Sequence, residues 1–121
     1  MTLLNTRFSK AIASFDGDEQ LFAELAQPVA EHYRLYADQI RLLLDDKNEK
    51  GLQKVAHKLK ATWALYTTDN TDLPERLEAA IKSGQSEMVL TLAESLTKSL
   101  YTVSRDLANW VEWFSQNGKD K

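Results

Sequence analysis

The sequence predicts an all-α protein, an antiparallel up-and-down four-helix bundle with an additional N-terminal helix. Apolar residues recur every three or four positions along most of the 121 residues, which is the spacing of one helix face. Only four Gly and two Pro occur, so the chain has little of the turn chemistry that many short strands require. Brief polar connections favour antiparallel neighbours. We expect a single domain over residues 1–121, with a bundle core at about residues 16–115.

The first two helices are expected between residues 4 and 43. A short N-terminal helix would present Leu4, Phe8, Ile12 and Phe15 on one face. Asp16 and Glu19 have the spacing of a capping box for the next helix. Pro28 lies inside that helix and has no N–H to donate, so we expect a kink there or a division into two pieces. The apolar seam of this helix comprises Phe22, Leu25, Val29, Tyr33, Tyr36, Ile40 and Leu43.

A third helix is expected after the break "DDKNEKG", and the polar stretch "TTDNTD" ends it. Its seam comprises Leu52, Val55, Ala56, Leu59, Trp63 and Tyr66. Asp72 and Glu75 then suggest a second capping box, with Pro74 in the first turn of a short helix. That helix would run to Ser83 and be closed by Gly84.

The last helix is expected to begin at Ser86, a candidate N-cap. Its apolar residues keep helical spacing for more than seven turns and comprise Val89, Leu92, Leu96, Leu100, Val103, Leu107, Trp110 and Phe114. This is the longest seam in the chain and would form the side of the bundle.

Composition limits the possible functions. The net charge of −3 argues against a general affinity for nucleic acid, which requires clustered positive charge. The absence of cysteine excludes disulfides, thiolate metal ligands and a thiol nucleophile. The opening "MTLLNTRFSKAIASF" lacks the apolar centre of a signal peptide, and no apolar run is long enough to span a bilayer. We therefore expect a cytoplasmic protein that does not bind membranes.

His57 is predicted to lie outside the seam of the third helix. At 100° per residue it projects about 140° from Leu52, flanked by the small residues Ala61 and Ala64. Lys60 lies close enough to interact with a group on the ring. A basic ridge beside the histidine comprises Lys47, Lys50, Lys54 and Lys58, provided the helix extends back to residue 47.

This arrangement suits a reversible nucleophile. An unperturbed imidazole has a pKa of about 6.5, so one ring nitrogen is free to attack phosphorus at neutral pH. Lys60 could compensate charge on phosphoryl oxygens, while Lys54 and Lys58 steer an acidic partner. Ala61 and Ala64 would let the partner's backbone approach. An exposed histidine beside lysines is also common on solvated helices, and this second interpretation stays open.

Other kinds of site find little support. A metal site in a bundle needs Glu-x-x-His pairs, but Lys54 and Val29 stand three residues before His57 and His32. No Gly-rich phosphate loop, GxSxG turn or HExxH motif occurs. His32 is interpreted as a residue at the boundary of its seam. We expect no bound metal or cofactor.

Two stretches of the chain, "LQKVAHKLKA" and "LEAAIKSG", resemble the histidine-containing phosphotransfer (HPt) family of two-component phosphorelays. Residues that match the family pattern are Leu52, Ala56, His57, Leu59 and Lys60 in the first stretch and Leu77, Glu78, Ala79 and Gly84 in the second. The lead-in "FDGDEQLFAEL" is also similar, and the resemblance covers about residues 15–110.

The resemblance implies a four-helix bundle that carries a phosphoryl group and has no turnover of its own. His57 would accept the group, through the ring nitrogen farther from the backbone, from an aspartyl phosphate on a receiver domain, and Lys60 would steady the phosphoryl oxygens. The implied partners are receiver domains of hybrid histidine kinases and response regulators. The Mg²⁺ that such transfers need would belong to the receiver.

The chain departs from the family pattern at three positions. Ala61 and Thr67 replace glycines, and Trp63 replaces a small residue and is expected to point into the core. Two alternatives to phosphotransfer therefore stay open. The chain could be a degenerate HPt-like bundle that binds receivers without accepting phosphate, or an unrelated helical adaptor. It could also be a piece of a larger hybrid kinase.

Overall fold

The computed structural model describes residues 7–117, and this part of the chain is all-helical, as predicted. Its helices are α2 (Ser9–Ala13), α3 (Glu19–Asp45), α4 (Glu49–Lys60), α5 (Trp63–Tyr66), α6 (Leu73–Lys82) and α7 (Ser86–Asn117). Within residues 7–117 there is no strand, and no helix is long and apolar enough to cross a membrane. Leu4, predicted for the first helix, lies outside the described residues.

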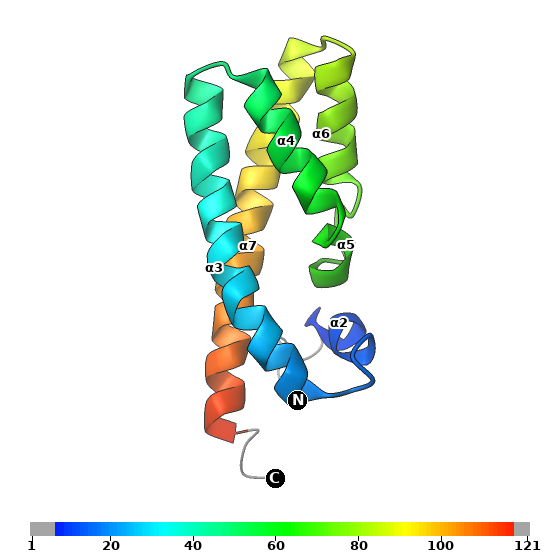
Figure 1. Ribbon diagram of the computed structural model, residues 1–121, viewed down its shortest axis with the longest axis vertical. Coiled ribbons are helices and arrows are strands. Elements are labelled where there is room, and N and C mark those ends of the chain that lie inside the picture. Colours follow the sequence, from blue (N-terminus) through cyan, green and yellow to red (C-terminus); the bar gives the residue numbers. More distant parts are fainter. Residues whose placement is uncertain (1–6, 118–121) are drawn as a thin grey trace.

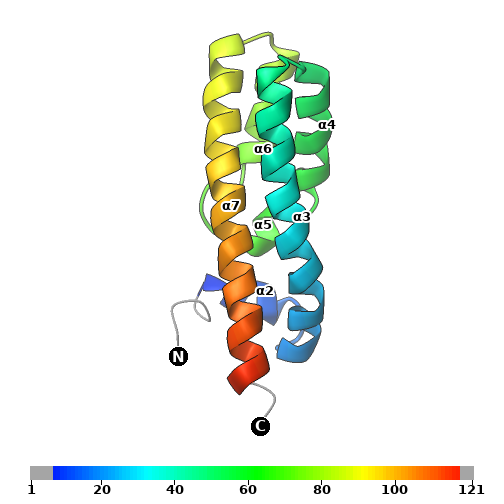
Figure 2. The same ribbon diagram turned by 90° about the vertical axis from the view of Figure 1, so that its left-hand side faces the viewer.

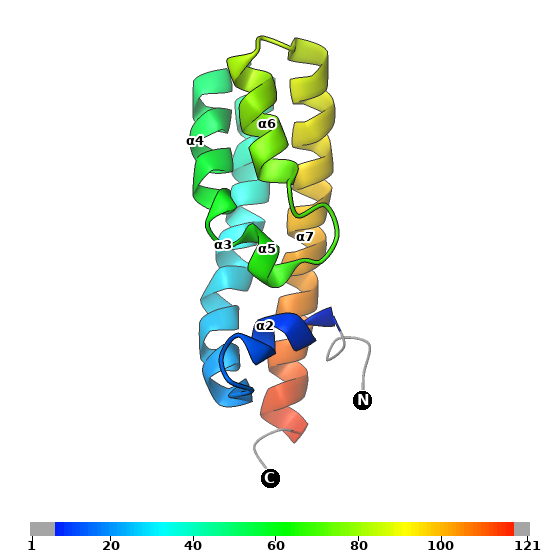
Figure 3. The same ribbon diagram turned by 90° about the vertical axis from the view of Figure 1, so that its right-hand side faces the viewer.

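The long helices α3 and α7 run side by side in opposite directions along the molecule (Figures 1 and 2). The shorter helices α4 and α6 lie beside one half of this pair, and α2 and α5 lie beside the other half (Figure 3). Helix α4 contacts α3 and α6, and α6 also contacts α7. The pair α4–α6 therefore lies across the core from the pair α3–α7.

The core follows the predicted seam throughout α7 and in large part in α3, where Phe22, Tyr33 and Ile40 are buried. Every predicted seam residue of α7 is buried. In α3, however, Leu25 is 41% exposed. Four small residues of α3 are buried instead, and small residues let a neighbouring backbone approach closely. They are Ala23, Ala26, Ala30 and Ala37. The Ser104 hydroxyl of α7 donates a 2.6 Å hydrogen bond to the Ala30 carbonyl of α3, which shows how closely the two helices pack.

Helix α3 begins later than its predicted capping box. Asp16 has a φ of 57°, outside the range of an N-cap, and the side chain of Asp18 accepts from the Leu21 N–H instead. Pro28 lies inside α3, but the helix continues to Asp45, so the predicted division does not occur. Because Pro28 is exposed, water can reach the backbone carbonyl that its missing N–H leaves without a partner.

The ends of α6 and α7 correct two further predictions. Asp72 precedes α6 but makes no capping hydrogen bond through its side chain. Ser86 is the first residue of α7 rather than its N-cap. The predicted closure of α6 is confirmed, because Gly84 follows Ser83 with a φ of 68°, a left-handed conformation that glycine adopts without strain.

The predicted third helix is interrupted. Helix α4 ends at Lys60, and Trp63 starts the separate turn α5. Thr62 between them has a φ of −124°, and its hydroxyl lies 2.9 Å from the Tyr33 hydroxyl. Trp63 donates a 2.9 Å hydrogen bond to the Asn70 carbonyl. Both Trp63 and Tyr66 are buried, as their spacing predicted, but they lie on the separate turn α5.

Candidate functional site

Helix α4 presents His57 to solvent. The opposite face of the helix is buried through Leu52, Val55, Ala56 and Leu59, as predicted. The His57 side chain is 71% exposed. The local sequence explains this position, because His57 is followed by Lys58 and preceded by the small, fully buried Ala56. The imidazole is therefore held at the surface by a helix that is anchored in the core.

Glu78 on α6 joins His57 to Lys60. One carboxylate oxygen, Oε2, lies 3.2 Å from His57 Nδ1. The other, Oε1, accepts a 2.7 Å hydrogen bond from Lys60 Nζ. The Glu78 side chain is only 9% exposed, although it carries a charge. A single buried carboxylate therefore positions both of the side chains that were predicted to act together.

Hydrogen bonding to Lys60 lowers the pKa of Glu78; burial opposes this effect and the His57 hydrogen bond adds to it. The carboxylate is thus ionised at neutral pH and can only accept hydrogen bonds. His57 must then carry a proton on Nδ1. In a neutral ring with this tautomer, the free lone pair is on Nε2, the nitrogen that Glu78 does not contact.

The same contact raises the pKa of Lys60, chiefly through its hydrogen bond to Glu78. Lys60 therefore stays protonated at neutral pH. An ammonium group has three N–H donors, so one can bind Glu78 while others remain available to a further acceptor. The site combines an exposed imidazole, a buried carboxylate and a cation.

The basic ridge is shorter than predicted. Lys50, Lys54 and Lys58 lie on α4 and are exposed. Lys47 is not part of the ridge, because it lies in the turn before α4 with a φ of 53°. The prediction failed there because the helix begins at Glu49, after the cap formed by Asn48.

The two predicted contact alanines end up on different segments. Ala61 directly follows α4 and is exposed beside the end of the histidine helix. Ala64 is also exposed, but it lies on α5. Its predicted direction beside His57 assumed a continuous helix, whereas the helix is interrupted between Lys60 and Trp63.

The buried carboxylate was not identified as a site residue from the sequence. Glu78 had been matched only as part of the "LEAAIKSG" pattern. A further signal was present, since Glu78 follows Pro74 by four residues and precedes Ile81 by three. This spacing places a charged residue on an otherwise apolar helix face. Such a carboxylate needs partners, and the sequence alone could not show that they come from α4.

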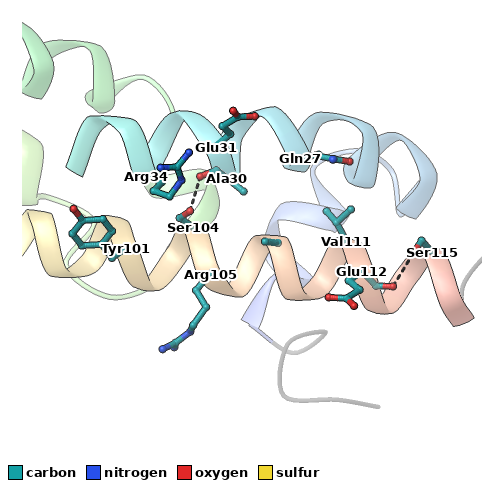
Figure 4. Close-up of a pocket in the computed structure, with 11 residues that line it drawn as sticks. Gln27, Ala30, Glu31, Arg34, Tyr101, Ser104, Arg105, Val111, Glu112 and Ser115 are labelled. Atoms are coloured by element: carbon teal, nitrogen blue, oxygen red, sulfur yellow. Dashed lines mark hydrogen bonds between the residues drawn. The ribbon is translucent and has the colours of Figure 1, made fainter. Parts of the chain in front are cut away.

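The remaining surfaces add no metal site. Within residues 7–117 no group of three or more acidic, histidine or cysteine side chains could hold a metal ion. His32 is exposed on α3. An open groove of about 860 Å³ lies between α3 and α7, where Ala30 and Ser104 meet (Figure 4). It is separate from the His57 site, which α4 and α6 form on the opposite side of the core.

Comparisons with known proteins do not assign the chain. No protein-family model, curated protein or solved structure matches it.

Proposed function

We propose that this chain is a phosphorelay carrier that accepts a phosphoryl group on His57 and passes it on. The observation that supports this best is the hydrogen-bond arrangement around the ring. Glu78 engages Nδ1, and the imidazole is 71% exposed, so the second nitrogen is accessible to another molecule. The donor would be the aspartyl phosphate of a receiver domain, and a second receiver would be the acceptor.

The transfer step balances with the groups present. The Nε2 lone pair of neutral His57 forms a bond to phosphorus, and the bond between phosphorus and the aspartyl oxygen breaks. The aspartate leaves as a carboxylate. The ring keeps its Nδ1 proton and becomes cationic, and the Glu78 carboxylate stabilises that charge at a distance of 3.2 Å.

Lys60 has a second role in this proposal. It neutralises Glu78 in the resting protein through the 2.7 Å hydrogen bond. Its other donors would interact with the phosphoryl oxygens once the group is attached. Lys54 and Lys58, together with Ala61, would contact the receiver and position it, because phosphoryl transfer depends mainly on positioning and charge compensation. Ala64 is a weaker candidate for this surface because it lies on α5.

The wider setting belongs to the same proposal. Helices α3, α4, α6 and α7 would form the up-and-down four-helix bundle of an HPt domain, with α2 as the additional N-terminal helix. The chain would act as one domain in the cytoplasm. It would have no turnover of its own and bind no cofactor, nucleic acid or membrane, because the receiver supplies the Mg²⁺.

A transfer assay tests the function directly. The protein is mixed with a receiver domain phosphorylated with radioactive phosphate, and the label on this chain is tested for acid lability and base stability. We expect labelled wild type and no label in His57→Gln. His32→Gln is the matched control, since the chain contains two histidines and His32 is also exposed. Label that persists in His57→Gln would refute the assignment.

Two other results would favour different interpretations. Receiver binding with no label in the wild type would support the degenerate binding module. Neither binding nor label from a panel of receivers would support an unrelated adaptor. For Lys60→Ala we expect label at a rate about tenfold lower. An unchanged rate would remove Lys60 from the proposed machinery.

A further inference from the structure

Helix α3 exposes a row of leucines that the core does not use. This row, here called the leucine face, comprises Leu21 (40% exposed), Leu25 (41%), Leu35 (48%) and Leu42 (65%). Leu21, Leu35 and Leu42 are separated by multiples of seven residues, and Leu25 is one turn after Leu21. Residues at this spacing lie along one stripe of a helix. The stripe extends for about 30 Å at 1.5 Å per residue.

The leucine face is wider than its four exposed members. Val29, Tyr36 and Leu43 are half-buried between this face and the core. Apolar surface thus extends from the core edge of α3 to its solvent side. Several exposed apolar residues along one stripe of a surface helix are typical of a binding site for another helix.

Carboxylates border the other edge of the leucine face. These carboxylates recur every seven residues along α3. This acidic row comprises Glu24, Glu31, Asp38 and Asp45. Three of them are exposed, and Asp38 is half-buried. Asp38 is held by the Tyr101 hydroxyl and by Arg34 at 3.7 Å. Glu24 accepts a 3.2 Å hydrogen bond from the exposed Gln20.

This charge pattern identifies one kind of occupant. In an antiparallel pair of α3 helices the two acidic rows would face each other, and like charges at this spacing repel. In a parallel pair each acidic row would lie against Val29, Tyr36 and Leu43 and lose hydration without gaining a cation. An anionic lipid surface would also be repelled by the exposed carboxylates Glu24 and Glu31. A basic amphipathic helix would place apolar side chains against the leucine face and cations beside the acidic row.

We propose that the leucine face docks a basic amphipathic helix of a partner protein. The apolar stripe of that helix would cover Leu21, Leu25, Leu35 and Leu42, and its lysines or arginines would pair with the acidic row. This surface is formed by α3, whereas the His57 site is formed by α4 and α6. A partner bound here would not need to compete with a receiver at His57.

A designed peptide tests the proposal with the full chain. The probe is a fluorescent helix of about three heptads, with leucine at two positions of each heptad and lysine beside them. A matched peptide carries glutamate in place of lysine. We expect the lysine peptide to bind and the glutamate peptide not to bind. Equal binding of both, or binding of neither, would overturn the proposal.

Surface variants locate the binding. We expect about tenfold weaker binding for Leu25→Ser/Leu35→Ser and for Glu24→Lys/Glu31→Lys. Leu90→Ser is the matched control, because Leu90 is 50% exposed on α7 but lies outside the leucine face. Circular dichroism verifies that each variant is folded. Equal weakening by Leu90→Ser would overturn the assignment to α3.

Two measurements on the protein alone cover the competing occupants. Sedimentation should show a monomer, and a dimer that Leu25→Ser/Leu35→Ser dissolves would assign this face to a second copy instead. Vesicles of phosphatidylcholine and phosphatidylserine should not bind the protein, and binding that depends on Leu35 would assign the face to lipid. Both results would overturn the proposal while leaving the His57 labelling assay unaffected.

Discussion

Helix α6 buries a carboxylate, whereas helix α3 exposes leucines, and each side chain is in the environment opposite to its preference. The Glu78 side chain is 9% exposed, and Leu42 is 65% exposed. Burying a charge is costly unless cations and hydrogen bonds compensate it. Glu78 has such compensation within the chain, from Lys60 at 2.7 Å and His57 at 3.2 Å.

The leucines of α3 have no comparable compensation among residues 7–117. Leu21, Leu25, Leu35 and Leu42 keep much of their surface in water, while the buried side of α3 combines four alanines with Phe22, Tyr33 and Ile40. The buried Glu78 and the exposed leucines of α3 therefore need different explanations. The carboxylate is explained by partners inside the protein, and for the leucines we propose a partner outside it.

The largest effect is expected at Glu78. Removing the carboxylate in Glu78→Ala should lower the rate of phosphotransfer to His57 about 100-fold, because it removes both the orienting hydrogen bond and the stabilising charge. Glu78→Gln keeps an oxygen that can accept from Nδ1 and should lower the rate about tenfold. Stopped-flow or quenched labelling with a phosphorylated receiver measures both rates. Equal rates for the two variants would contradict the prediction that the hydrogen bond to Nδ1 and the negative charge of Glu78 contribute separately.

The alanine side of α3 gives the next largest effect. Ala26 is fully buried, so Ala26→Leu should force α3 away from its neighbours and lower the free energy of unfolding by about 2 kcal/mol. Chemical denaturation measures this value. Ala26→Ser adds only a hydroxyl group and provides a replacement smaller than leucine for comparison. A neutral Ala26→Leu would show that the close packing of α3 does not explain why the leucines lie outside.

The Lys60–Glu78 pair predicts a pH dependence of stability. Glu78 has a lowered pKa, so its contribution is present above the ordinary value of 4.5 and is lost as pH falls through the lower folded value. Lys60 has a raised pKa, so its contribution is present below 10.5 and is lost as pH rises through the higher folded value. Between these limits the wild type should have a higher free energy of unfolding than Glu78→Gln.

Denaturation of both proteins from pH 3 to pH 9 tests this dependence. The difference between them should be constant near neutral pH and should shrink in acid. A difference that stays constant down to pH 3 would contradict the assigned ionisation of Glu78.

The smallest effect is expected on the leucine face. Leu35→Ser removes a side chain that is 48% exposed and should change the free energy of unfolding by less than about 0.5 kcal/mol. Leu96→Ala, at a fully buried position of α7, should cost about 3 kcal/mol in the same assay. A large loss for Leu35→Ser would show that this leucine stabilises the fold, which would weaken the case for a partner.

The sequence predicted residues whose environment depends on one helix, and it failed where two segments interact. The seam of α7 was correct because α7 runs uninterrupted over 32 residues and its apolar periodicity has a single face. Leu25 was misplaced because apolar spacing favours leucine over alanine, and only the close approach of α7 explains why Ala26 is buried instead. The break before Trp63 was missed because it accompanies the hydrogen bond from Trp63 to Asn70, a contact outside the helix pattern.

By itself, the sequence determined the helical class of the described chain and the surface position of His57, since both follow from apolar spacing of 3.6 residues per turn. Only the tertiary structure decided that Glu78 reaches His57 and Lys60, 21 and 18 residues earlier in the chain. It also decided that Ala23, Ala26, Ala30 and Ala37 of α3 are buried while Leu21, Leu25, Leu35 and Leu42 remain exposed. Periodicity tells which side of a helix is apolar, but the neighbour that covers that side is set by how closely two backbones can approach.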